Sequence, residues 1–349
     1  MSDPNTINIL CVIGGGARGH LPNEFAEVLF NRMGIDHTKV WQKFQVVAGA
    51  SIGGIITAAY GYGYSPADVR PFFTEKGKRL FTIRTVPVGC DADTDGNRPN
   101  LAQKALLFAT SDPFYKSPCS PTEGNSNYGD NILQESLIDR FGTDTLQDIK
   151  TNILIPSLST NTNQFKMFSN FDNPFYTGKD EKIVDVLRAT SAAPIYLPSY
   201  SFGGNTYIDG GIFCNNVALE ALQFAKLKFP KANRFCIFSL GTGRGQYSFD
   251  GSGTPTNDLE SLATQAMHIF GQAMDGQSAS VDRILKMKAL YNTTETVFYY
   301  DFNPAFAPEV DKALDNTAPE FQTYLTDLAA TVFNNDLAEI DTVLDAMRA

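Results

Sequence analysis

The sequence predicts an α/β fold with a mostly parallel central sheet. Residues 7–13 form a nearly continuous apolar run that ends at three glycines, which is typical of a strand buried on both faces of a parallel sheet. Residues 20–33 follow with apolar side chains at helical spacing. Residues 44–49 and 51–60 then repeat the order of strand, turn and helix. This alternation of strands and helices indicates an α/β fold.

The pattern resumes after a long irregular segment. Residues 84–128 are rich in Pro, Gly, Asn, Ser and Asp, with helical spacing only near residues 101–108. A segment of this length between regular elements often covers a functional site. Beyond it, the apolar patterns predict helices over residues 132–141, 182–190 and 218–229, strands over residues 152–159, 164–169 and 234–240, a strand ending at Ile208, and a mostly helical remainder with a strand at residues 296–302.

Length and charge restrict the class of protein without naming its function. The 349 residues suffice for two domains or one large α/β domain, and 43% hydrophobic with 19% charged residues indicate a folded globular protein. Lys and Arg total 28 against 38 Asp and Glu, so the formal net charge is -10. A chain this acidic is not expected to bind a nucleic-acid polymer, and contact with lipid would depend mainly on apolar surface.

The sequence predicts a cytoplasmic protein that associates with membranes only transiently. Its five cysteines lie far apart and include no C-x-x-C pair, which favours reduced thiols. The first six residues carry an acid and no basic residue, unlike a signal peptide. Residues 44–66 contain no Asp, Glu, Lys or Arg, but their glycines, tyrosines and Gln45 favour a buried strand and helix over a transmembrane span.

One motif places a serine where a nucleophile would lie. The segment Gly49-Ala-Ser51-Ile-Gly53 is the only G-x-S-x-G in the chain and falls between a predicted strand and a predicted helix. Flanking glycines permit a tight turn there that leaves the serine hydroxyl accessible. The alternative is a turn whose serine only caps the helix. The strand before and the helix after favour Ser51 as a nucleophile.

A carboxylate is the better candidate for the base. The chain has only three histidines, His20, His37 and His268, and only His268 follows the serine as an α/β-hydrolase requires. His268 lies among apolar residues of a predicted helix. Only one strand precedes the strand-turn-helix elbow that carries Ser51, whereas that fold places several before its nucleophile. Asp209 ends an apolar strand before two glycines, and a carboxylate bonded to Ser51 would accept its proton and later activate water. The alternative is an ordinary Asp-Gly turn.

The glycine-rich segment Gly14-Gly15-Gly16-Ala-Arg-Gly19 directly follows the first strand. Its amides would point at an anion, such as the oxyanion that develops on an ester carbonyl. A dinucleotide is the rival ligand, but it requires an acid at the end of the second strand, which instead ends in glycine; Asp36 lies before that strand.

No metal or cofactor is expected. Residues 91–96 resemble the start of an EF-hand calcium loop, but Ala102 stands where a bidentate Glu is needed and Pro99 occupies the ninth position. No His/Cys cluster has zinc spacing. A polar loop is the better interpretation.

Together these motifs resemble the patatin-like phospholipase family over most of the chain. The three glycines resemble its oxyanion loop, the G-x-S-x-G its nucleophile elbow, and Asp209 its dyad aspartate. Residues 191–198 and 239–243 resemble its recurrent structural stretches. One departure is Ile13, where plant patatins have an acid before the glycines. The motif residues that would support the site are Arg18, Gly19, Gly49, Gly53, Gly210 and Gly211.

The resemblance implies a three-layer α/β/α sandwich in a single domain over residues 1–349. Its parts would be a core at about 7–245, a loop-rich insertion at about 84–128 and a helical part at about 258–349. It implies hydrolysis of glycerophospholipids and related lipid esters by Ser51 and Asp209, without metal or cofactor. A hydrolase-like binding module with little turnover, for example a nucleotide-sensing one, is the alternative. Either would be compatible with a small-molecule or protein activator.

Overall fold

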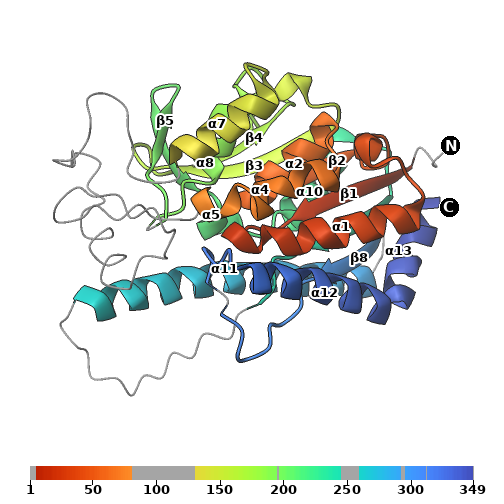
Figure 1. Ribbon diagram of the computed structural model, residues 1–349. Helices are drawn as coiled ribbons and strands as arrows, with labels where there is room; N and C mark the ends of the chain where they lie inside the picture. Colours follow the sequence, from red (N-terminus) through yellow and green to blue (C-terminus); the bar gives the residue numbers. More distant parts are fainter. Residues whose placement is uncertain are drawn as a thin grey trace.

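The computed structural model describes residues 5–80, 130–194, 196–244, 259–291, 295–311 and 313–348 (Figure 1). Its strands are β1 Thr6–Val12, β2 Val46–Gly49, β3 Asn152–Ser159, β4 Gln164–Ser169, β5 Tyr200–Phe202, β6 Asn205–Asp209, β7 Arg234–Leu240 and β8 Thr296–Phe302. They form one sheet in the order β5-β6-β3-β2-β1-β7-β8, with β4 paired to β3. The neighbouring strands β3, β2, β1, β7 and β8 are parallel to one another, and β4, β5 and β6 form antiparallel pairs. The predicted α/β fold with a mostly parallel sheet is confirmed.

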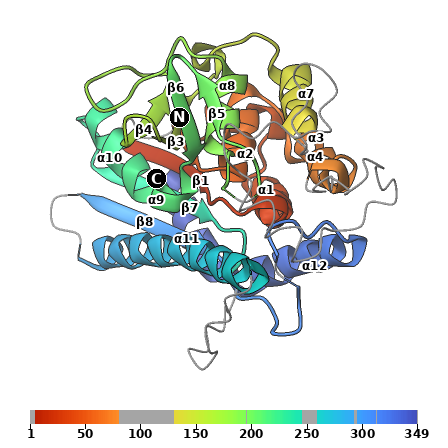
Figure 2. The ribbon, with the colours of Figure 1, turned by 90° about the vertical axis from the view of Figure 1, so that its left-hand side faces the viewer.

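Helices cover both faces of the sheet, which makes three layers (Figures 1 and 2). Side chains of β1 alternate between two apolar cores: Leu10 and Val12 point to one face, Ile9 and Cys11 to the other. The first face packs against α1, α2, α8, α12 and α13, and the second against α10 and α11. The helices span α1 His20–Met33, α2 Ile52–Tyr62, α7 Asp130–Phe141, α8 Ile183–Thr190, α10 Ala218–Lys228, α11 Leu259–Leu290, α12 Pro319–Asn335 and α13 Leu337–Arg348.

Four one-turn α-helices in the described part of the chain were not anticipated from the apolar pattern: α3 Pro66–Val69, α4 Pro71–Thr74, α5 Gly77–Leu80 and α9 Gly211–Cys214. Pro66 and Pro71 stand at the first position of their helices, where the missing N–H costs nothing, and a proline disfavours helical continuation from the turn before it. The expected insertion at residues 84–128 lies outside the described residues.

The uncharged stretch at residues 44–66 forms β2 and α2 inside the fold, as expected. Nearly all of α2 is buried. Within the described part of the chain, no helix combines the length and apolarity needed to cross a membrane.

The branching of the sheet at β3 brings distant segments together. β2 pairs with residues 152–154 of β3, and β6 pairs with residues 157–159. Because β4 occupies the other edge of β3 over residues 154–159, β6 must lie on the same edge as β2, beyond its end. The last residue of β6, Asp209, therefore reaches the place where the chain leaves β2 for α2.

Candidate active site

Ser51 stands on a strained turn between β2 and α2. Its backbone has φ 55 and ψ -128, a conformation that residues with a side chain rarely adopt. A Cβ on Gly49 would lie 2.3 Å from the backbone of Gly53, and a Cβ on Gly53 would lie 2.1 Å from the carbonyl oxygen of Val12. Both glycines of the motif are therefore required by close backbone approach. The turn aims the serine side chain away from the sheet, into a pocket.

The amide of the strained residue is held by a side chain that the sequence analysis did not single out. The N–H of Ser51 donates to Thr190 Oγ1 over 3.0 Å, and the Thr190 hydroxyl donates to the carbonyl oxygen of Pro156 over 2.7 Å. Thr190 is fully buried at the end of α8. It therefore links the turn to β3.

Replacing Thr190 with the isosteric valine is expected to lower the free energy of unfolding by about 1–3 kcal/mol, because it leaves the buried Ser51 N–H without its acceptor. Urea denaturation would measure the change. The matched control is Thr342→Val, an exposed threonine of α13, expected to change stability by less than about 0.5 kcal/mol. A Thr190→Val protein as stable as the wild type would show that the bond does not support the turn.

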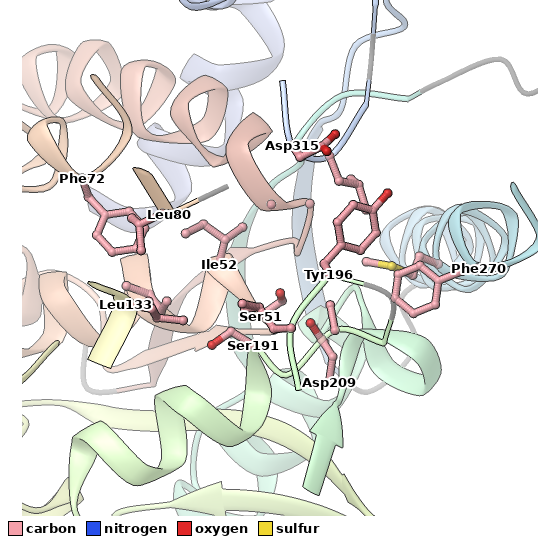
Figure 3. Close-up of a pocket in the computed structure, with 17 residues that line it drawn as sticks. Ser51, Ile52, Phe72, Leu80, Leu133, Ser191, Tyr196, Asp209, Phe270 and Asp315 are labelled. Atoms are coloured by element: carbon pink, nitrogen blue, oxygen red, sulfur yellow. The ribbon is translucent and has the colours of Figure 1, made fainter. Parts of the chain in front are cut away.

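Asp209 meets Ser51 at this turn. Asp209 and Ser51 are 1% and 7% exposed, and both line one pocket, where the Ser51 side chain lies beside the Asp209 carboxylate (Figure 3). The N–H of Gly211 donates to Asp209 Oδ1 over 2.7 Å. Burial raises the pKa of Asp209 to about 7, while the neighbouring Ser51 hydroxyl and the N–H of Gly211 act to lower it. A carboxylate with a pKa in this range can take up and release a proton near neutral pH.

The glycine-rich turn lies beside the pair. Gly15 and Gly16 line the pocket, and Gly16 has φ +58. The N–H of Gly14 instead donates to the side-chain oxygen of Asn215 over 3.1 Å. Of the three glycines assigned to an oxyanion hole, Gly15 and Gly16 are thus the ones that line the pocket.

The remaining motif residues lie in these turns or next to them. The buried Arg18 lies 5.8 Å over the ring of Phe306, with its Nε 3.5 Å from the carbonyl oxygen of Gly15. Gly19 ends the short 3-10 helix Gly16–Gly19. Gly210 follows β6 and precedes the short helix α9 Gly211–Cys214.

A pocket with about 780 Å³ of empty space, part of it open to solvent, surrounds Ser51 and Asp209 (Figure 3). Most of its lining is apolar, which suits a hydrocarbon chain. In the view of Figure 3, Phe72, Leu80 and Leu133 lie on one side of Ser51, and Tyr196, Phe270 and Asp315 lie on the other.

The histidines lie elsewhere, as far as the structure describes them. His20 packs on Phe73 with its Nε2 3.1 Å from Thr326 Oγ1, and burial lowers its pKa. No histidine is among the described residues that line the pocket. His268 belongs to α11.

The candidate calcium loop at residues 91–96 lies outside the described residues. Among the residues that are described, no three His, Cys, Asp or Glu side chains gather as a metal site would require. Cys11, Cys214 and Cys236 are buried free thiols.

Comparisons with known proteins find several relatives of this chain. The chain is 28% identical over 263 residues to Patatin-like protein 2 of Arabidopsis thaliana, covering 68% of this chain and 60% of that protein. It is 28% identical over 262 residues to a cGAMP-activated phospholipase of Vibrio cholerae, covering 71% and 67%. It is 26% identical over 340 residues to calcium-independent phospholipase A2-gamma of Mus musculus, covering 91% and 38%. The chain thus spans less than two thirds of the length of the plant and mouse relatives.

A family model described as patatin-like phospholipase matches residues 10–222. The match runs from β1 to α10 and includes the strained serine, the glycine turn and Asp209. The chain belongs to the patatin-like phospholipase family.

Proposed function

We propose that the chain is a phospholipase A-type acyl hydrolase, which cleaves ester bonds of glycerophospholipids through an acyl-enzyme on Ser51. The observation that carries the proposal is that Ser51 and Asp209 lie side by side in one apolar pocket, which Gly15 and Gly16 also line. Nucleophile, base and anion-stabilising donors need this proximity for acyl transfer.

The proposed reaction uses one proton acceptor for both halves. Ionised Asp209 accepts the Ser51 proton as Oγ attacks the ester carbonyl, and the amides of Gly15 and Gly16 donate to the oxyanion. The tetrahedral intermediate collapses, the C–O bond to the glycerol oxygen breaks, and Asp209 returns the proton to that oxygen. Asp209 then takes a proton from water as the water oxygen attacks the acyl carbonyl. The second tetrahedral intermediate collapses, the bond between the acyl carbon and Ser51 Oγ breaks, and Asp209 returns the proton to Oγ as the fatty acid leaves.

The pocket supports a long-chain lipid ester as substrate. Phe72, Leu80 and Leu133 come from α4, α5 and α7, the elements on either side of residues 81–129, and offer an apolar wall to an acyl chain. Burying a chain there would gain about 25 cal/mol per Å² of apolar surface. Because the chain has a net charge of -10, we propose that its transient contact with a membrane depends on apolar groups.

The relative named as a cGAMP-activated phospholipase is the ground for proposing that a small molecule regulates turnover here as well. The alternative of a binding module without turnover would need an unreactive serine. The assembled pair of Ser51 and Asp209 favours the enzyme.

Labelling with a fluorophosphonate tests the proposed function directly. The wild-type chain is expected to form a covalent adduct on Ser51 and to release fatty acid from phosphatidylcholine vesicles, assayed with and without cyclic dinucleotides. The modified residue would be located by mass spectrometry. Absence of any adduct at Ser51 under every condition would remove the proposal and favour the binding module.

The pH dependence follows from the raised pKa of Asp209. The base acts in its ionised form, so kcat/KM is expected to rise about tenfold per pH unit up to about pH 7 and to level off above it. A soluble nitrophenyl ester assayed between pH 5 and 9 would give the profile, since its own ionisation state does not change. A rate that is independent of pH over this range would contradict Asp209 as the base.

A further inference from the structure

Both polar groups of Gly14 are held by buried side chains. Its N–H donates to Asn215 Oδ1 over 3.1 Å, and its carbonyl oxygen accepts from the Thr242 hydroxyl over 2.9 Å. Asn215 Nδ2 also lies 3.5 Å from the same carbonyl oxygen. Asn215 and Thr242 are each 2% exposed, so solvent does not compete for these bonds. Gly14 is therefore fixed at both of its peptide bonds.

The planarity of the peptide bond transmits this constraint to Gly15. The carbonyl of Gly14 and the N–H of Gly15 belong to one peptide unit and point in opposite directions. When Thr242 holds the carbonyl, the direction of the Gly15 N–H is set. Thr242 also packs directly on Gly15, where a Cβ would lie 2.1 Å from its Oγ1.

Asn215 in turn is held by α11. Its Nδ2 donates to Ser278 Oγ over 3.3 Å, and the Ser278 hydroxyl donates to the carbonyl oxygen of Met274 over 2.9 Å. Asn215 follows Asp209 by six positions, so the segment that carries the candidate base also carries one half of this contact. Among the described residues that line the pocket, neither Asn215 nor Thr242 is included. Neither residue would therefore contact a substrate directly.

We propose that Asn215 and Thr242 are positioning residues that aim the Gly15 N–H at the oxyanion of the transition state. The inference rests on the proposed acyl hydrolysis at Ser51. A donor aimed in advance stabilises the charged intermediate more than the planar ester, so its loss lowers kcat more than it changes KM. Removing a single donor of this kind costs about 10²–10³-fold in kcat, and misdirecting one is expected to cost about 10–100-fold.

The test compares Thr242→Val, which keeps the shape and removes the donor, with Thr242→Ser, which keeps the hydroxyl. In Thr242→Val, kcat for a soluble nitrophenyl ester is expected to fall about 10–100-fold with KM changed less than about twofold. Thr242→Ser is expected to recover most of that loss. Asn215→Ala releases the other end of Gly14 and is expected to show the same pattern.

A long-chain trifluoromethyl ketone separates orientation of the oxyanion donor from general loss of structure. It binds as a tetrahedral adduct of Ser51 with an oxyanion, whereas the matched methyl ketone stays planar. Affinity of Thr242→Val for the fluoroketone is expected to fall by the same factor as kcat, and affinity for the methyl ketone to change less than about twofold.

The outcomes distinguish this inference from the function on which it rests. A wild-type chain that neither hydrolyses the ester nor binds the fluoroketone would contradict the proposed function itself. An active wild type whose Thr242→Val and Asn215→Ala variants bind both ketones with unchanged affinity would overturn the positioning role. Equal loss of affinity for both ketones would assign the two residues to folding and would overturn it too. If Thr242→Val does not fold, Asn215→Ala decides the question by the same comparison, its loss of affinity for the fluoroketone against its loss of affinity for the methyl ketone.

Discussion

Replacing Ser51 with alanine is expected to lower the rate of ester hydrolysis by about four to six orders of magnitude, to the level of the unassisted reaction in the pocket. The substitution removes one oxygen and with it the nucleophile, so no acyl-enzyme forms. Turnover of a nitrophenyl ester and release of fatty acid from vesicles would both be measured. The fluorophosphonate adduct is expected to disappear with the activity.

The fold of Ser51→Ala should persist, because alanine faces the same positive φ as serine and its N–H still donates to Thr190. Its free energy of unfolding is expected to stay within about 1 kcal/mol of the wild-type value. A folded Ser51→Ala protein that hydrolyses the ester at a near wild-type rate would show that the nucleophile lies elsewhere.

Asp209→Asn is expected to lower kcat on the order of 10⁴-fold, because the amide keeps the shape and the bond from Gly211 but cannot take the Ser51 proton. His268→Ala is the matched control that separates a dyad from a triad. It is expected to keep most of the activity, since Asp209 already lies beside the serine. If His268→Ala is folded but inactive while Asp209→Asn remains active, the assignment of the base would be reversed.

Asp209→Asn should also change how stability depends on pH. The pKa of the folded-state carboxyl is about 7 against an ordinary value of 3.8, so between these values the folded wild type holds a proton that the unfolded chain releases. The contribution of this carboxyl to the wild-type free energy of unfolding therefore falls as pH rises from about 4 to 7. The asparagine variant does not show that loss. Relative to the wild type, the variant is expected to gain on the order of 2 kcal/mol between pH 5 and pH 8, measured by urea denaturation. If the difference in free energy of unfolding between Asp209→Asn and the wild type is the same at pH 5 and pH 8, the carboxyl is not desolvated in the folded protein.

The arrangement of strands and helices was predictable because its signals are local. Buried strands such as residues 7–13 show as continuous apolar runs, and the turn at Ser51 shows as glycines between a strand and a helix. The one-turn helices α3, α4, α5 and α9 could not be predicted because four residues are too few for a helical period to appear. The antiparallel pairing of β6 with β3 also could not be predicted, because the composition of neither strand indicates it.

The sequence by itself determined which residues carry candidate chemistry: a serine on a glycine elbow, an aspartate at a strand end, and three glycines after β1. Only the tertiary structure decided their contacts. Ser51 meets Asp209 because β6 continues the edge of β3 that β2 leaves, and the amide of Gly14 is taken by Asn215, 201 residues away. Periodicity and turn chemistry act over a few residues, whereas a hydrogen bond across the sheet depends on strand order and register. Tertiary contacts set both.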